Sequence, residues 1–268
     1  MTGWDSAAAL AAAPIRSRYW VKASIDAEAT SHWGGAWTNS AVATTPGQAY
    51  TNNAEGLGVF PTIDPVRKFI TRAGAHDFGN PSPGTFWVCD RLVGVGELEL
   101  TATGTKTVNS TALPRYTNGD GVMVFAMAAT AVGSTNIPVM RLSSYTNQDG
   151  TSSRSATDAL TWVGATTDIG HVTGPFPLQG GDTGVRSVES VEVTTASAGT
   201  TAKFHIFLLR PLIMLDLENG GQMFTEHDTM NHLHHLRRIY DGASLVALIG
   251  GYTGSEETNG SLTVALDV

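Results

Sequence analysis

The chain of 268 residues is poor in cysteine and in charge. Cys89 is its single cysteine, so an intrachain disulfide cannot form and a cysteine-based metal site is not expected. Only 15% of the residues are charged, against about a quarter in an average domain. The formal net charge is −8, and no run of basic residues occurs. Because phosphate binding needs clustered lysine and arginine, the sequence predicts no nucleic-acid partner.

Long hydrophobic runs are also missing. No stretch approaches the roughly 18 apolar residues of a membrane-spanning helix, so we expect no membrane partner. The alanine-rich segment 7–13 follows Trp4 and Asp5 and has no basic residue before it. We therefore expect no secretion signal, and assembly in the cytoplasm of the cell that makes the protein.

Motifs that carry catalysis are absent from the sequence as well. It contains no Gly-x-Ser-x-Gly, phosphate loop, dinucleotide fingerprint or EF-hand. Glu97 with Glu99 and Glu189 with Glu192 are the carboxylate pairs that could serve a glycoside hydrolase. Glu97 and Glu99 alternate with apolar residues, which is typical of the solvated face of a strand. We predict no enzymatic activity and no cofactor.

What the sequence does contain is strand signals. Segments 96–101, 190–194 and 261–266 alternate apolar with polar residues, as strands with one wet face do. Segment 122–127 is apolar on both faces, which is expected of a strand inside a sandwich. Segment 204–209 follows the 190–194 strand after a short loop. We interpret these two as a β-hairpin whose second strand is central and buried.

Turn signals separate the strands, at 118–121, 148–150, 180–184 and 219–221. Glycine supplies positive φ there, and asparagine or aspartate tolerates it and bonds to the local backbone. The turns at 148–150 and 180–184 lack calcium-ligand spacing, so plain turns are the better interpretation. Many short strands with such punctuation predict an all-β fold, with an antiparallel β-sandwich or jelly-roll domain over residues 85–268.

Residues 1–84 have a different character. Trp20, Trp33 and Trp37 are spread among Gly, Asn, Ser, Thr and Pro, with few sustained strand patterns. This composition predicts a loop-rich region pinned by aromatic residues. An extended arm that orders against neighbouring subunits fits it, and so does a small N-terminal β subdomain.

One segment, 225–236, has the pattern of a short C-terminal helix. It lacks glycine and proline, and Thr225 with Asp228 nearly matches a capping box. His232 and His235 would share a face of this helix and are the best candidate metal ligands. Because spacing fixes no third ligand, we predict solvated or interface histidines and no metal.

Five segments combine turn and strand residues in a recognisable order: 113–116, 121–122, 145–150, 180–188 and 238–243. Together they resemble landmarks of a family of tailed-bacteriophage virion proteins that are described only as structural. The resemblance spans about half of the chain, from Leu113 to Ala243. It implies a place in the virion and assigns no catalytic or binding residue.

These observations lead to a hypothesis of function. The chain would be a structural component of a phage particle, most specifically a homotrimeric capsid decoration or cement protein. Its partners would be the major capsid protein and its own copies, because capsid shells offer three-fold sites and avidity adds weak contacts together. A neck or tail protein stays open, as does an appendage module that binds a cell-surface glycan. The glycan module would need exposed Trp or Tyr beside Asp and Asn on neighbouring loops.

Overall fold

The architecture comes from a computed structural model of the whole chain. It describes residues 15–22, 33–35, 48–49, 67–77, 84–133, 136–162, 166–167, 169–198, 201–217, 224–228, 238–250 and 258–267. Every regular element in these ranges is a β-strand, and all of the strand pairs are antiparallel. None of the described residues forms a helix suited to cross a membrane. The prediction of an all-β antiparallel fold is confirmed.

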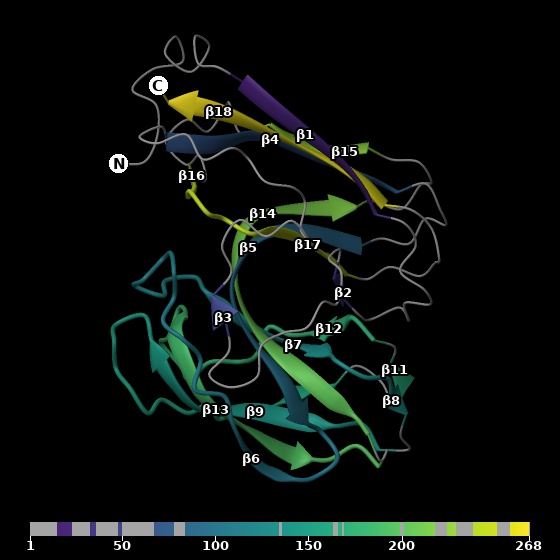
Figure 1. Cartoon of the computed structure of the whole chain (residues 1–268), viewed down its shortest axis with the longest axis vertical. Helices are drawn as coiled ribbons and strands as arrows, with labels where there is room; N and C mark the ends of the chain where they lie inside the picture. Colours follow the sequence, from purple (N-terminus) through teal and green to yellow (C-terminus); the bar gives the residue numbers. More distant parts are fainter. Residues whose placement is uncertain are drawn as a thin grey trace.

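A five-stranded sheet forms one end of the molecule, at the top of Figure 1. Its strand order is β1–β18–β4–β15, and β16 also pairs with β4. The strand bounds are β1 Ile15–Lys22, β4 Arg67–Asp77, β15 Phe224–Asp228, β16 Arg238–Ile239 and β18 Thr258–Asp267. The strand predicted at 261–266 is therefore present, and it lies between two partners, β1 and β4.

The central sheet has seven strands and connects the two ends. Its pairings run β14–β7–β12–β2–β17–β5, and β5 pairs with β14 again, so six strands close into a ring. The seventh, β3, pairs with β5. The bounds are β2 Trp33–Gly35, β3 Gln48–Ala49, β5 Gly84–Glu99, β7 Met123–Ala128, β12 His171–Thr173, β14 Lys203–Leu217 and β17 Leu245–Gly250. The long strands β5 and β14 run side by side from the middle of the molecule into its lower half (Figure 1).

An outer sheet covers the lower half. Its order is β10–β9–β13–β6, and a separate two-stranded ribbon pairs β8 with β11. The bounds are β6 Gly104–Thr107, β8 Val132–Gly133, β9 Val139–Asn147, β10 Leu160–Thr161, β11 Thr166–Thr167 and β13 Val185–Thr195. This sheet and the lower part of the central sheet form the predicted sandwich.

Apolar clusters lie on both faces of the central strands. Val124 of β7 packs in the sandwich core with Leu142 of β9 and Val191 of β13. Phe125 lies on the opposite face of β7, because successive side chains of a strand alternate. It packs with Phe207 of β14 in a second cluster, to which five of the six ring strands contribute. Strands covered on both faces must be apolar throughout, which confirms the interpretation of segment 122–127.

The predicted hairpin is wrong, although its second strand is central and buried as expected. β13 pairs with β6 and β9 in the outer sheet, whereas β14 pairs with β5 and β7 in the central sheet. The loop between them therefore crosses the sandwich. The physical reason is burial: β14 needs cover on both faces, while β13 keeps a partly exposed face. An apolar pattern reports how a strand is buried and does not identify the strand beside it.

The predicted helix is also wrong at its start. Phe224–Asp228 is the strand β15, which pairs with β4 from His76 to Arg72. Hydrogen bonds to a neighbouring strand override a helix propensity that is only a weak local preference. Residues 229–236, with the candidate ligands His232 and His235, lie outside the described residues.

The strands on the two sides of residue 84 share sheets. β1 and β4 pair with β18, and β4 also pairs with β15. β2 lies between β12 and β17, and β3 pairs with β5. The division between residues 1–84 and 85–268 therefore does not coincide with a boundary between sheets. The rest of residues 1–84, including Trp37, lies outside the described part of the chain.

Candidate functional site

Three of the four turns singled out in the sequence, 118–121, 148–150 and 180–184, lie together in the structure, and the fourth, 219–221, lies outside the described residues. Asp120 and Gly184 form a single antiparallel bridge, and the Gln148 amide donates to the Gly184 carbonyl oxygen at 3.1 Å. The Tyr116 hydroxyl donates to the Arg238 carbonyl oxygen at 3.4 Å. Segments far apart in sequence thus meet at one place. We call the set the turn cluster: residues 113–122, 145–154, 179–188 and 238–244.

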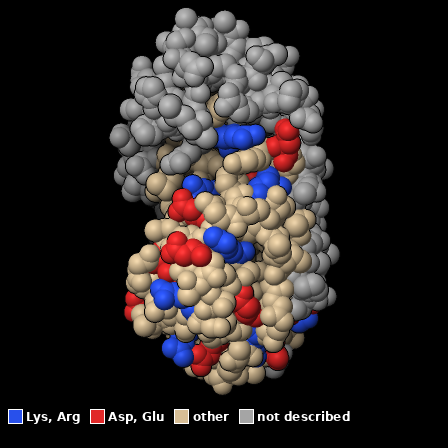
Figure 2. All heavy atoms as spheres, turned by 90° about the vertical axis from the view of Figure 1, so that its left-hand side faces the viewer, with Lys and Arg blue, Asp and Glu red and all other residues tan. Residues whose placement is uncertain are grey.

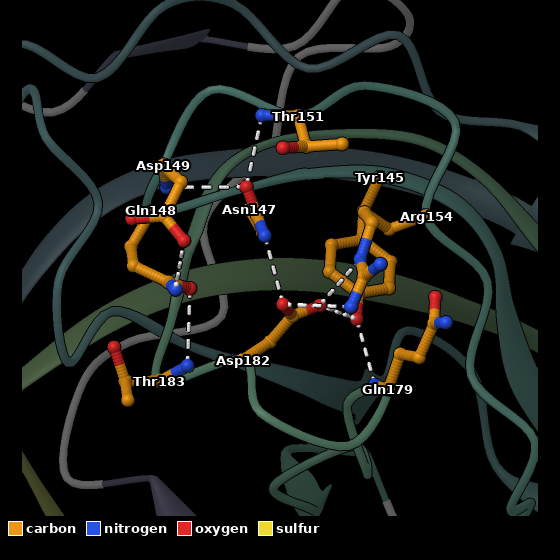
Figure 3. A network of polar contacts seen from close by, with 9 residues as sticks. All are labelled: Tyr145, Asn147, Gln148, Asp149, Thr151, Arg154, Gln179, Asp182 and Thr183. Atoms are coloured by element: carbon orange, nitrogen blue, oxygen red, sulfur yellow. Dashed lines mark hydrogen bonds and ion pairs between the residues drawn. The ribbon is translucent and has the colours of Figure 1, made fainter.

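Asp182 is the centre of the polar network in Figure 3. Its carboxylate accepts two hydrogen bonds from Arg154 at 3.0 Å, one from the Tyr145 hydroxyl at 2.5 Å and one from Asn147 Nδ2 at 2.8 Å. Burial alone would raise the pKa of Asp182, but the bonds from Arg154, Tyr145 and Asn147 outweigh it and hold this pKa below its usual value. The ionised carboxylate therefore ties the 180–184 turn to the end of β9.

Further bonds fix the shapes of the turns around this centre. Asn147 Oδ1 accepts the backbone amides of Asp149 at 3.1 Å and Thr151 at 2.9 Å, which closes the turn locally. Gln148 Oε1 accepts the Thr183 amide at 3.0 Å, so the two turns are also joined to each other (Figure 3). The Arg186 guanidinium donates to the Gln148 carbonyl oxygen at 2.6 and 3.0 Å. Side chains here satisfy backbone groups of neighbouring turns.

A buried ion pair between Arg115 and Asp90 connects the turn cluster to β5. Arg115 Nε and Nη2 donate to the Asp90 carboxylate at 2.9 and 2.7 Å, and the Ser244 amide donates to it at 3.0 Å. The Asp90 side chain is fully buried and that of Arg115 is 5% exposed. Burial raises the pKa of Asp90, and the bonds from Arg115 and Ser244 oppose that rise. The pair joins β5 to the 113–116 segment and to the loop before β17.

Two tyrosines complete the turn cluster. The Tyr116 and Tyr240 rings pack edge to face with centroids 4.8 Å apart. The Arg210 guanidinium lies 5.7 Å from the Tyr116 centroid, and that of Arg238 lies 4.5 Å from the Tyr240 centroid. Burial raises the pKa of Tyr116. A guanidinium over each ring occupies a face on which a sugar would stack.

The carboxylate pairs considered for hydrolysis are engaged elsewhere. Glu97 pairs with Lys203 at 2.8 Å, and Glu99 accepts the Thr101 hydroxyl at 2.6 Å. Both glutamates are exposed, as expected for the solvated edge of a strand. Glu192 pairs with Arg141 at 2.6 Å. Glu189 accepts hydroxyl hydrogen bonds, which come from Ser144, Thr146 and Ser187.

The side chains within the described ranges do not form a metal site. No three His, Cys, Asp or Glu side chains gather there in a way that could hold an ion. Cys89 is buried in β5, where burial raises the pKa of its thiol, so it is a core residue as expected. Trp162 is 1% exposed and belongs to the sandwich core.

The sequence did not predict the ion pair between Asp90 and Arg115. The two residues are 25 positions apart, and no motif spacing links them. One signal was present, because Asp90 and Arg91 interrupt the apolar run of β5 between Cys89 and Leu92. A charge inside a strand that is otherwise apolar needs a buried partner.

Comparisons with known proteins identify no family. No protein-family profile and no curated protein matches the chain. One solved structure that aligns is titled "Structure of infectious bursal disease virus Gt strain", with 10% identity, 95% of this chain and 81% of that chain covered, and a TM-score of 0.20. Another is that of the Gx strain, with 8% identity, 95% and 79% coverage and a TM-score of 0.21. TM-scores this low carry no argument about fold or function.

Proposed function

We propose that this chain is a structural component of a bacteriophage particle, and most specifically a decoration protein of the head shell. The observation that carries the proposal is how the turn cluster uses its polar groups. Arg154 and Asn147 both donate to the Asp182 carboxylate, and Asn147 also accepts two backbone amides. These bonds stiffen the loops and commit the polar groups to the fold. The place in the virion is supported by the resemblance of these same segments to tailed-phage virion proteins.

The distribution of charge on the surface favours binding to other proteins. The partners would be the major capsid protein and further copies of this chain in a homotrimer. Figure 2 shows acidic and basic side chains interspersed over the described part of one face, without a large area of either sign. Such a surface suits contacts whose specificity comes from matched charges. Loops held by internal hydrogen bonds can dock with little rearrangement.

The proposed mechanism is mechanical. Each subunit of a trimer would contact the shell weakly, and the three contacts together would give stable attachment through avidity. Bound across neighbouring capsid subunits, the protein would resist the outward pressure of packaged DNA. No side chain performs chemistry in this account.

A glycan-binding appendage is the second candidate, and one observation favours it. Tyr116 and Tyr240 are half-buried tyrosines that lie next to the loop carrying Asn118 and Asp120. The guanidiniums of Arg210 and Arg238 over their rings count against sugar stacking. We therefore rank it below the structural role. A neck or tail position is a further alternative within that structural role.

The decoration role predicts a loss of shell stability. Particles assembled without this chain should release their DNA at a lower temperature than complete particles, because the shell lacks its added contacts. Adding the purified protein to them should restore the original release temperature, measured by the fluorescence of a DNA-binding dye. Release at the same temperature with and without the chain would contradict the decoration role.

A further inference from the structure

The seam between β5 and β14 contains a bulge near one end. Phe204 pairs with Leu98 and Ile206 pairs with Val95, so two residues of β5 lie opposite His205 alone. Glu97, one of those two, has a φ of 56°. This left-handed conformation costs a non-glycine residue about 1 kcal/mol, so the bulge needs other contacts to hold it.

His205 supplies one such contact. Its Nδ1 accepts a hydrogen bond from the backbone amide of Glu97 at 3.2 Å. His205 is 5% exposed, and its ring makes a T-shaped contact with the Phe207 ring, with centroids 6.0 Å apart. Only the neutral imidazole has a lone pair on Nδ1, since both ring nitrogens of the cation are donors. The bond therefore exists only while His205 is unprotonated.

Among the described residues of β5 and β7, little lies beside His205 that could stabilise a positive charge. From β5, Glu97 directs its carboxylate to Lys203 of β14 at 2.8 Å, and Glu99 bonds to Thr101. From β7, the residue paired with His205 is Met127, and that strand carries no charged side chain. Burial lowers the pKa of His205 to about 4, and the Glu97 carboxylate opposes this only in part.

We propose that His205 is an acid-released latch: its neutral ring holds the Glu97 bulge closed, and its protonation opens this end of the β5–β14 seam. Protonation places a donor against the Glu97 amide, which then has no acceptor at this position. The residues released first are those beside the bulge, Leu98 and Phe204. This device is independent of the proposed place in a phage particle.

The direction of the pH effect follows from linkage. The folded pKa of about 4 lies below the unfolded value of about 6.5, so the open form binds the proton more readily. The latch is fully effective above pH 6.5 and weakens as the pH falls toward 4. Between pH 7 and 4.5, the opening equilibrium should rise about 50-fold. The bond to Lys203 holds the pKa of Glu97 below its usual value, so Glu97 also favours opening in acid. Its share is at most about two-fold, because an unfolded glutamate with a pKa of about 4.3 is less than half protonated at pH 4.5.

Amide hydrogen exchange of the full chain tests the latch. The protection factor of the Glu97 amide, corrected for intrinsic exchange, should fall about 50-fold from pH 7 to 4.5. The Thr151 amide, which bonds to the non-titrating Asn147 Oδ1, is the internal reference and should stay nearly constant. Equal changes at the two amides would overturn the proposal.

The variant His205→Asn provides an independent check. Its Oδ1 can stand where Nδ1 stands and accept the same amide, but it cannot be protonated in this range. We expect its Glu97 amide to lose the acid-dependent opening, and its stability in urea to fall less between pH 7 and 4.5 than that of the native chain. An unchanged pH dependence in the variant would refute the latch even if the variant is less stable overall.

Discussion

Replacing Asp90 by alanine should lower the free energy of unfolding by about 3 to 5 kcal/mol, the largest single-site effect we expect. The substitution leaves the Arg115 guanidinium buried without its bidentate partner. A guanidinium cannot lose its proton to escape that environment. The Ser244 amide also loses its acceptor, so the loop before β17 is loosened at the same time. Urea denaturation followed by circular dichroism measures the loss.

Variants of the partner separate a lost charge pair from lost packing. Arg115→Met should cost less than Asp90→Ala, because Asp90 can take up a proton once the guanidinium is gone. The double variant Asp90→Leu/Arg115→Met should recover most of the stability, since apolar replacement of a buried pair is often neutral. Glu192→Ala, which breaks the partly exposed pair with Arg141, is the control and should change stability by less than about 1 kcal/mol. An Asp90→Ala loss no larger than this control would contradict the role of the pair.

Replacing Gly184 by alanine should cost at least about 3 kcal/mol. A Cβ at this position would overlap the carbonyl oxygen of Gly119 and lie 2.7 Å from the Gly121 amide nitrogen. Both are backbone atoms of the opposing turn, so no side chain can rotate away to make room. The 118–121 turn and the start of β13 would have to separate, which breaks the Asp120–Gly184 bridge.

Gly180 provides the matched control in the same turn. A Cβ there has no atom within 4 Å, and its φ lies outside the left-handed region. Gly180→Ala should therefore change stability by no more than about 0.5 kcal/mol. The difference between the two urea midpoints measures how closely the turns approach. Similar midpoints for the two variants would show that the turn cluster is not closely packed at Gly184.

The sequence predicted burial better than it predicted pairing. Segment 122–127 was apolar on both faces, and β7 lies between two apolar clusters. The hairpin failed because β13 and β14 are consecutive in the chain but belong to different sheets. The helix failed at Thr225 because β4 offers this segment a row of backbone partners that no local pattern reveals.

The turn cluster shows the same limit for the candidate site. The sequence identified the turns at 118–121, 148–150 and 180–184 from their glycines and short polar residues. It did not show that Asp182 would collect three side chains from β9 and the loop after it, because such contacts depend on how distant turns meet. Turn chemistry is local and readable, whereas the contacts between turns come from the tertiary fold.

The most direct test of the structural role is the copy number of this chain in purified phage particles. DNA-filled heads and tails are separated on a density gradient, and the chain is quantified against the major capsid protein by mass spectrometry. The account predicts that the chain is in the head fraction, at one copy per capsid subunit or one per three. A few copies per particle would contradict the decoration role and favour the neck, vertex or tail, and absence from both fractions would contradict a place in the virion.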